Sequence, residues 1–359
     1  MVISNRSTFM SPRQVMVSGA TGYVAGWLIK RLLEAGHHVH AAVRDPANKQ
    51  KLAHLEALQA DLPGNITYFA ADLLVEGSYA EAMADCEIVC HTASPFSLRV
   101  KDAQRELVDP AKLGTRNVLE QAKRTSSVRR VVVTSSYVAV FGDNADFLAS
   151  GKPFLSEDDW NTTSSLTHQP YSFSKTEAER EAWKIAQTQD QWRLVTVNPA
   201  FVMGPGISPY ATSESFNFMT QLADGTFKSG IPNFGVGLVD VREVADAHLG
   251  AAFIPEAEGR YLISAENSSF PEIAQILRDQ FGDDFPFPKR IIPKALIWLI
   301  GPLIDKTLSR RVLARNVGYP VKIDNRKSIR ELGITYRPLE ETVTQMFQQL
   351  IDEGIVVPS

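Results

Sequence analysis

Residues 15–26, with the sequence VMVSGATGYVAG, decide the fold of this chain. The first three form an apolar run typical of a buried strand, and residues 27–36 have the spacing of a helix that stops at a glycine. Between them, Gly19 permits a tight turn and Gly22 lets a phosphate approach the backbone. N–H groups at the start of the helix would meet the pyrophosphate of a dinucleotide. An ordinary βα turn is the alternative, but both flanks and a second strand at 39–43 favour the dinucleotide.

Length and composition limit the class of protein. The chain has 359 residues, so we expect one large domain or two closely joined ones. A net charge of -4 favours neither nucleic acid nor an anionic membrane as a partner, which leaves small molecules. The two cysteines, Cys86 and Cys90, cannot form a disulfide framework and lack metal-site spacing. They predict reduced thiols, a cytoplasmic protein and no bound metal. The sequence leaves open whether the protein is a monomer or a homodimer.

Two further segments bear on targeting. Residues 1–12 are polar and lack an apolar signal core, so we expect a disordered lead. Residues 291–304 form the most apolar stretch, but it is too short to span a bilayer and contains Pro293 and Pro302. This stretch predicts a buried or surface-packing helix, and no membrane partner is expected.

Strand and helix patterns alternate from residue 13 to about residue 140. After the glycine turn, strands are expected at 39–43, 66–69, 87–91 and 131–133. Helices are expected at 49–60, 79–84 and 109–124. Repeated βα units predict a parallel sheet that is covered by helices on both faces.

The end of the second strand indicates which dinucleotide is bound. Arg44 lies 22 residues after Gly22, where a protein that binds NAD usually carries an acid for the ribose 2′-hydroxyl. An arginine suits the 2′-phosphate of NADP instead, and Lys51 could add a second positive charge. The alternative is a solvated strand end, because Asp45 stands directly beside Arg44.

A catalytic pair is indicated at the start of a helix that runs from Tyr171 to about Thr188. Tyr171 and Lys175 are four residues apart and share one helical face. A nearby ammonium should lower the pKa of the tyrosine. Ser136 follows a strand at the carboxyl edge, where ligands bind in open α/β sheets, and could hydrogen-bond a substrate carbonyl. Taken alone, a chance pair and a turn-capping serine stay open as alternatives.

The second half of the chain is less regular. Residues 142–169 are polar and rich in turn residues, so we expect an extended surface loop. A strand at 194–197 ends in Asn198-Pro199. Residues 204–237 are rich in Gly and Pro, so we expect an irregular stretch that forms the mouth of a substrate cleft. The following side chains could form walls of that cleft or pack in the core: Phe201, Met203, Phe216, Phe218 and Phe234.

The remaining patterns define the expected domains. A helix at 239–252, a strand at 260–263 and a helix at 270–281 precede a mostly helical end. We assign 13–200 to a dinucleotide-binding domain, with 236–264 returning to it, and 201–235 and 265–359 to a substrate domain. The second domain carries a basic run that we expect to be a solvated surface: Lys289, Arg290, Lys306, Arg310, Arg311 and Arg315.

With these residues placed, the chain resembles the extended short-chain dehydrogenase/reductase superfamily along most of its length. It is most similar to the dihydroflavonol reductase-like, NADPH-dependent aldehyde and ketone reductases. The resemblance lies in the order and spacing of Gly19-Ala20-Thr21-Gly22, Val43-Arg44-Asp45-Pro46, Ala71-Asp72-Leu73, His91-Thr92-Ala93-Ser94-Pro95, Val133-Thr134-Ser135-Ser136, Tyr171-Ser172-Phe173-Ser174-Lys175, and Asn198-Pro199 with Gly204-Pro205.

The resemblance implies an α/β Rossmann-type, doubly wound parallel sheet with a smaller, mostly helical C-terminal substrate domain. It implies hydride transfer from NADPH to the carbonyl of an aldehyde or ketone, with Ser136, Tyr171 and Lys175 as the catalytic set and Tyr171 as proton donor. The implied cofactor contacts are Gly19, Thr21, Gly22, Tyr23, Val24, Arg44, Lys51, Asp72, Leu73, Thr92, Ala93, Ser94, Tyr171, Lys175, Pro199 and Val202. The implied substrate contacts are Ser94, Phe96, Ser136, Phe141 and Phe201.

Two positions depart from the pattern of the family. Ala25 replaces the third glycine of the turn, which is tolerable where a helix packs. Phe141 replaces a polar residue that contacts the flavonoid in plant dihydroflavonol reductases, which favours a less polar carbonyl compound. Two other functions stay open: a nucleotide-sugar epimerase or dehydratase with tightly bound NAD(P), which the basic run favours, and a non-catalytic NADP-binding sensor.

Overall fold

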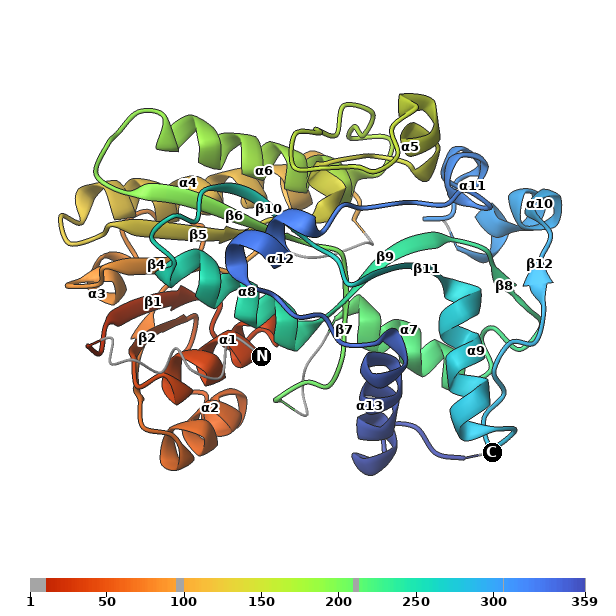
Figure 1. Ribbon diagram of the computed structural model, residues 1–359, viewed down its shortest axis with the longest axis horizontal. Helices are drawn as coiled ribbons and strands as arrows, with labels where there is room; N and C mark the ends of the chain where they lie inside the picture. Colours follow the sequence, from red (N-terminus) through yellow and green to blue (C-terminus); the bar gives the residue numbers. More distant parts are fainter. Residues whose placement is uncertain (1–10, 95–99, 209–212, 306, 359) are drawn as a thin grey trace.

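The centre of the computed structural model, which describes residues 11–94, 100–208, 213–305 and 307–358, is a parallel sheet of seven strands (Figure 1). The strand order is β10-β6-β5-β4-β1-β2-β3, so the order reverses between β1 and β4. The strands are β1 (Gln14–Ser18), β2 (His38–Val43), β3 (Asn65–Ala70), β4 (Ile88–His91), β5 (Arg130–Thr134), β6 (Arg193–Pro199) and β10 (Gly259–Ile263). The predicted doubly wound Rossmann-type fold is confirmed.

Helices cover both faces of this sheet. On one face α1 (Tyr23–Glu34) packs against α8 (Val241–Phe253), and on the other α4 (Asp109–Arg124) packs against α6 (Pro170–Ala186) (Figure 1). Two shorter elements complete this half: α2 (Lys49–Asp61) and α3 (Ala80–Met83). Residues of β1 alternate between the two layers, because Val15 and Val17 join one apolar cluster and Met16 joins the other.

A second, smaller region lies beyond the carboxyl edge of β6. It contains a three-stranded sheet of β7 (Phe201–Met203), β9 (Gly235–Asp240) and β11 (Glu266–Ser269), and a short pair of β8 (Ile231–Pro232) and β12 (Ile291–Ile292). Its helices are α7 (Glu214–Ala223), α9 (Phe270–Phe281), α10 (Lys294–Ile304), α11 (Arg310–Asn316) and α13 (Leu339–Asp352). Phe347 of α13 is fully buried in a separate apolar cluster, which belongs to this region.

The C-terminal segment also returns to the large sheet. The helix α12 (Arg326–Leu332) packs against α8 and β10. By contrast, β9 pairs with β7 and β11 and not with the seven-stranded sheet. The predicted division into two domains, one of residues 13–200 and 236–264 and one of residues 201–235 and 265–359, stays a prediction.

Three local predictions are wrong. The expected surface loop 142–169 contains the helix α5 (Asn144–Ser150), which a capping box of Asp143 and Asp146 begins. The irregular stretch 204–237 contains α7, which the Ser213 side chain caps. The helix expected from 239 begins at Val241, because residues up to Asp240 belong to β9.

The possible walls of the cleft are mostly core residues. Met203, Phe216 and Phe218 are buried in the apolar cluster of the smaller region. Phe201 packs against Phe218, with ring centroids 6.2 Å apart. The alternative of core packing therefore holds for these side chains.

The expected lead, residues 1–12, lies almost wholly outside the described residues. Cys86 and Cys90 are free and buried, and burial raises the pKa of each thiol to about 12. Within the described ranges, no helix is long and apolar enough to cross a membrane. The same ranges contain no group of acidic, histidine or cysteine side chains that could hold a metal ion.

Candidate active site

The glycine turn after β1 is shaped for close approach. Gly19 has a φ of +65°, and a Cβ there would lie 2.9 Å from the Ala93 Cα. Gly22 is the N-cap of α1, and its N–H donates to the Gly19 carbonyl at 2.9 Å. The first turn of α1, which contains Tyr23 and Val24, has no acidic residue and no side-chain cap. Its N–H groups therefore suit an anion, as a pyrophosphate requires.

Residues after the turn fasten α1 to the smaller region. Ala25 is 1% exposed, so a small side chain fits the position where the family pattern has a glycine. The Tyr23 hydroxyl donates to the Gly204 carbonyl at 2.5 Å, and the Trp27 indole donates to the Pro205 carbonyl at 2.8 Å. Burial raises the pKa of Tyr23 well above its ordinary value and keeps this donor protonated.

A buried serine joins β1 to β4 at the point where the strand order reverses. Ser18 Oγ lies 2.8 Å from Nδ1 of His91 and accepts from the backbone N–H groups of Thr92 and Ala93, each at 3.1 Å. Thr92 and Ala93 therefore lie beside the glycine turn. Burial and the charge of Lys175 lower the pKa of His91 to about 3, so this ring is neutral.

Basic side chains follow β2. Arg44 and Lys51 are both exposed, and the described residues offer neither of them an ion pair. The neighbouring Asp45 is engaged in its own turn, because its carboxylate accepts the Ala47 N–H at 2.9 Å. Two cations without acidic partners suit the ribose 2′-phosphate of NADP better than the ribose 2′-hydroxyl of NAD.

The segment after β3 borders the same edge. The Asp72 carboxylate accepts the Leu74 N–H at 2.8 Å and is exposed. Leu73 rests on α4, where a Cβ added to Gly114 would lie only 2.3 Å from Leu73 Cγ. Gly114 is therefore required for the close packing that holds Leu73 in place.

Ser136, Tyr171 and Lys175 come from neighbouring elements. Ser136 follows β5 and accepts the Val138 N–H at 3.4 Å, so it caps the 3₁₀ turn η2 (Tyr137–Ala139). Tyr171 and Lys175 lie on successive turns of α6, which packs against η2. The Lys175 Nζ is 6.0 Å from the centre of the Tyr171 ring.

The electrostatics of this pair differ from the expectation. Burial is the largest influence on the pKa of Tyr171 and raises it well above 10, and the nearby Tyr137 and Glu214 raise it further. Burial lowers the pKa of Lys175 to about 8, although Glu179 opposes the shift. The net pKa of Tyr171 is therefore raised and not lowered as the pattern predicted, because the cost of burying a phenolate dominates.

Sequence reasoning missed the buried acid behind Lys175. Glu179 is 1% exposed, and its carboxylate accepts from Ser135 at 2.5 Å, from Asn198 at 2.7 Å and from Arg260 at 2.6 Å. Asn198 also donates to the Ser136 carbonyl at 3.1 Å. Glu179 lies one turn after Lys175 on α6, and this four-residue spacing could have identified Glu179 from the sequence.

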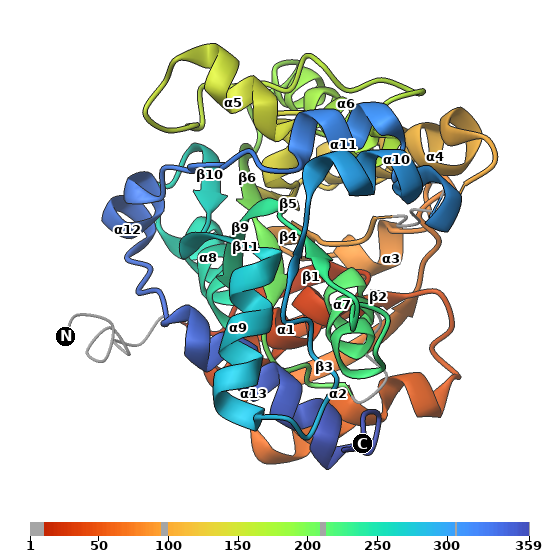
Figure 2. The same cartoon turned by 90° about the vertical axis from the view of Figure 1, so that its right-hand side faces the viewer.

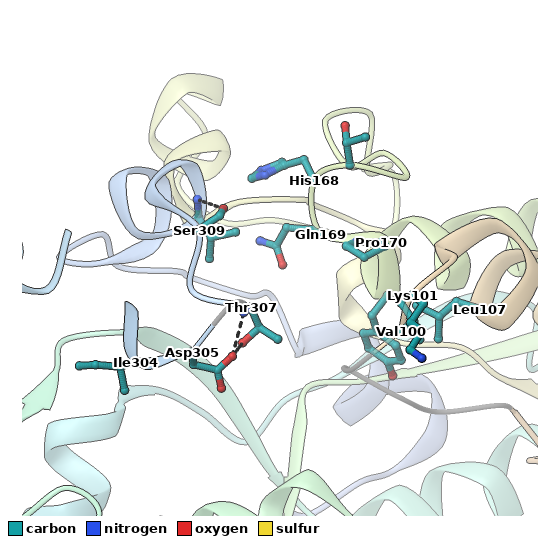
Figure 3. Close-up of a pocket in the computed structure, with 13 residues that line it drawn as sticks. Val100, Lys101, Leu107, His168, Gln169, Pro170, Ile304, Asp305, Thr307 and Ser309 are labelled. Carbon is teal, nitrogen blue, oxygen red and sulfur yellow. Dashed lines mark hydrogen bonds between the residues drawn. The ribbon is translucent and has the colours of Figure 1, made fainter. Parts of the chain in front are cut away.

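One cavity of about 800 Å³ opens beside Tyr171. Figure 3 draws the residues that line this cavity. Its wall combines the segment before η1 (Gln104–Val108), the residues that lead into α6, and the connection from α10 to α11. The lining side chains are Val100, Lys101, Leu107, Thr167, His168, Gln169, Pro170, Tyr171, Ile304, Asp305, Thr307, Ser309 and Val312. Among the described residues, Tyr171 is the one expected site residue in this wall.

The other expected substrate contacts lie elsewhere or outside the described residues. Phe141 is 6% exposed in the main core and stacks edge to face on Tyr137, with ring centroids 5.3 Å apart. Phe201 is partly buried in β7, beside Val202 and after Pro199 at the end of β6. Ser94 is exposed after β4, and Phe96 lies outside the described residues.

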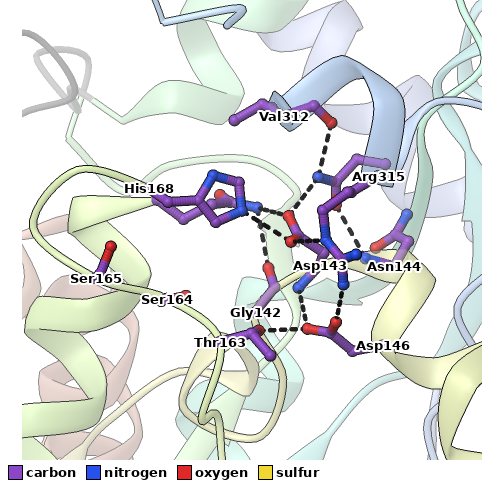
Figure 4. A network of polar contacts seen from close by, with 12 residues as sticks. Gly142, Asp143, Asn144, Asp146, Thr163, Ser164, Ser165, His168, Val312 and Arg315 are labelled. Carbon is purple, nitrogen blue, oxygen red and sulfur yellow. Dashed lines mark hydrogen bonds and ion pairs between the residues drawn. The ribbon is translucent and has the colours of Figure 1, made fainter. Parts of the chain in front are cut away.

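A buried carboxylate fixes the loop that leads into α6 (Figure 4). Asp143 accepts from His168 at 2.8 Å, from Arg315 at 2.6 Å and from Asn316 at 2.7 Å. Gln169, which directly precedes α6, donates to the same carboxylate at 3.0 Å. The network ties α11 to the start of α6, and Arg315 of the expected solvated basic run is therefore ion-paired instead.

The comparisons with known proteins agree with this geometry. Residues 15–260 match the NAD dependent epimerase/dehydratase family, and the chain belongs to that family, the extended short-chain dehydrogenases/reductases. The expected family is thus confirmed.

Individual relatives are reductases. The chain is 33% identical to cinnamoyl-CoA reductase CAD2 of Medicago truncatula over 94% of this chain and 95% of the relative. It is 32% identical to the bifunctional dihydroflavonol 4-reductase/flavanone 4-reductase of Malus domestica over 74% and 76% of the two chains. The solved structure of yeast methylglyoxal/isovaleraldehyde reductase Gre2 complexed with NADPH has a TM-score of 0.77 and 27% identity, and the match covers 96% of this chain and all of Gre2. The resemblance to dihydroflavonol reductase-like reductases is confirmed.

Proposed function

We propose that this protein is an NADPH-dependent reductase that converts the carbonyl of an aldehyde or ketone into an alcohol, with Tyr171 as proton donor. The observation that carries the proposal is the position of Tyr171 in the wall of an 800 Å³ cavity, one helical turn from Lys175. A cavity of this size suits a drug-sized organic substrate.

The residues at the carboxyl edge fit NADPH. The turn at Gly19 and Gly22 would hold the pyrophosphate, Arg44 and Lys51 the 2′-phosphate, and Asp72-Leu73 the adenine side. Thr92, Ala93 and Lys175 would border the nicotinamide half. When bound, NADPH supplies the hydride.

The side chains of this chain then have distinct tasks. Tyr171 stays protonated, because burial raises its pKa, and its hydroxyl can hydrogen-bond the carbonyl oxygen and give up its proton as negative charge develops there. Ser136 would hold the same oxygen. Lys175, protonated below a pKa of about 8, would offset the phenolate charge left on Tyr171.

The substrate class rests on the lining of the cavity and on the relatives. Val100, Leu107, Ile304 and Val312 supply apolar surface, and the relatives include proteins named for aldehydes and for flavonoids. Sugar nucleotides are the competing substrates. Their diphosphate needs cationic anchors, whereas the described lining holds one lysine, Lys101, together with Asp305. Free, buried cysteines support a cytoplasmic protein.

Cofactor consumption against a substrate panel tests the proposal. NADPH absorbance should fall in proportion to added aldehyde or ketone, with the alcohol as product. An epimerase would convert UDP-sugars without net oxidation of the cofactor, and a sensor would bind NADPH without turnover. Either of those results would overturn the proposed function.

A further inference from the structure

Exposed apolar side chains concentrate on one helix. Of the fifteen large apolar side chains that are exposed among the described residues, six fall between residues 291 and 304. They are Ile291, Leu296, Trp298, Leu299, Leu303 and Ile304. Leu303 is 87% exposed, and Leu296, Leu299 and Leu303 recur at the three- and four-residue spacing of one helical face. Such a concentration marks a contact surface.

The inner face of α10 is firmly packed, so the outer face belongs to a formed helix. Ile297 is 3% exposed, and Gly301 lies so close to α11 that an added Cβ would be 2.6 Å from the Leu313 side chain. The helix lies at one end of the molecule, and no other labelled element covers its outer side (Figures 1 and 2).

The surroundings of α10 are basic. Residues 285–315 contain seven lysines and arginines but one acid, Asp305, in a chain whose net charge is -4. Five of these cations are exposed: Lys289, which pairs with Asp283, and Arg290, Lys294, Arg310 and Arg311. The Arg310 guanidinium lies 5.0 Å from the centre of the exposed Trp298 ring, so positive charge and apolar surface adjoin. Leucine, tryptophan and flanking cations are the composition of helices that lie in a membrane interface.

We propose that the outer face of α10 docks on an anionic phospholipid membrane. Leu296, Leu299 and Leu303 would enter the interface, while the flanking cations would meet the headgroup phosphates. A second copy of this chain fits the same face less well, because a two-fold contact would bring its cations together. The proposal revises the sequence-based expectation of no membrane partner, and it requires contact with the surface and no span.

Docking would also orient the cavity. Ile304, the last residue of α10, is 69% exposed and lines the cavity that contains Tyr171 (Figure 3). If the proposed function holds, on which this part rests, a lipophilic aldehyde or ketone could pass between the bilayer and Tyr171.

Co-sedimentation with vesicles tests the docking without any activity measurement. The full-length protein should bind vesicles of phosphatidylcholine and phosphatidylserine, bind pure phosphatidylcholine less, and be released by salt. Leu299→Gln/Leu303→Gln should weaken the binding roughly tenfold or more, and Arg311→Glu roughly fivefold or more. The matched controls Leu148→Gln/Ile329→Gln and Lys184→Glu alter exposed side chains of α5, α12 and α6 and should bind as the wild type does.

The docking proposal would be refuted if the wild-type protein did not bind anionic vesicles. It would also be refuted if the control substitutions weakened the binding as much as the substitutions in and beside α10. A wild-type dimer that Leu299→Gln/Leu303→Gln converts to a monomer would also overturn it, because a second copy would then cover α10. NADPH oxidation with a water-soluble aldehyde, measured on the same samples, should be unchanged in all variants. If the wild type showed no NADPH oxidation, the proposed function would be refuted, but the vesicle measurement would still decide whether α10 docks on membranes.

Discussion

Tyr171 and Lys175 are neighbours on α6. Burial shifts the pKa of each side chain in the direction that favours its uncharged form. The phenol is held protonated, and the pKa of the ammonium is lowered to about 8. In the proposed reaction these shifts suit a proton donor that stays neutral until it gives up its proton to the carbonyl oxygen. The lysine then reduces the cost of that charge.

The pKa of Lys175 predicts a pH dependence. The ammonium is present below about pH 8 and is lost as the pH rises through that value. If it helps to hold the cofactor, kcat/KM for NADPH should fall about tenfold per pH unit above about pH 8. In Lys175→Arg the side chain stays charged, so the fall should vanish from this range even if the rate is lower. A wild-type profile that stays flat to about pH 10 would contradict this role.

We assign the choice of NADPH over NADH to Arg44. Arg44→Asp should weaken NADPH binding roughly tenfold to a hundredfold and relatively favour NADH, because a charge-assisted contact contributes about 1.5–3 kcal/mol. Fluorescence titration with both cofactors measures the change. The control Arg326→Asp alters another exposed arginine, which pairs with Asp324, and should keep the NADPH preference. Equal wild-type affinity for NADH and NADPH would refute the assignment.

At the scale of elements, the turn between β1 and α1 depends on Gly19. Gly19→Ala should lower NADPH affinity by more than about tenfold, because the new Cβ would meet Ala93 and shift the turn. Gly36→Ala is a matched control: its φ of +78° is equally unfavourable, but nothing lies within 4 Å of the new Cβ. That variant should lose about 1 kcal/mol of unfolding free energy and keep its NADPH affinity. Equal NADPH binding by both variants would show that the contact with Ala93 is unimportant.

The Asp143 network joins α5, α6 and α11, and its removal should be costly. Burial raises the pKa of Asp143, but hydrogen bonds from His168, Gln169, Asn316 and Arg315 outweigh it, and the net shift is downward. Its stabilising effect is therefore full above the ordinary aspartate pKa of about 4 and is lost as the pH falls below it.

Asp143→Ala should lower the free energy of unfolding by about 2 kcal/mol or more at neutral pH, since it leaves buried donors unpaired. Urea unfolding measures this loss. Asp324→Ala, which breaks a pair with the 75% exposed Arg326, should cost less than about 1 kcal/mol. Similar losses in the two variants would argue against a structural role for the network.

The elements that the sequence predicted well are those whose signal is local. The glycine turn, the buried strands and α4 are fixed by apolar periodicity and by backbone requirements. For α4, both ends of the predicted helix, residues 109 and 124, agree with the structure. Short α5 and α7 were missed because side-chain caps at Asp143 and Ser213 begin them inside polar or Gly/Pro-rich stretches. Local turn residues there outweighed the weaker helical signal.

At the scale of the whole molecule, the order of motifs predicted a doubly wound parallel sheet, because βα units admit few topologies, and the structure shows that it has seven strands. The candidate site was predicted less completely. Tyr171 is in the cavity wall as expected, but Ile304, Asp305 and Ser309 reach that wall from more than 130 positions away in the chain. Glu179 and His168 likewise acquire their partners only through tertiary packing, which no periodicity within one segment reveals.

The rate of the Tyr171→Phe variant shows whether Tyr171 is the proton donor. The substitution keeps the ring and removes the hydroxyl, so the melting temperature and NADPH affinity should stay close to wild type. Single-turnover reduction of an aldehyde that the wild type accepts should slow by about 10²–10⁴-fold, because the general acid is lost. A Tyr171→Phe protein that folds, binds NADPH and reduces the aldehyde at a near wild-type rate would show that Tyr171 is not the proton donor.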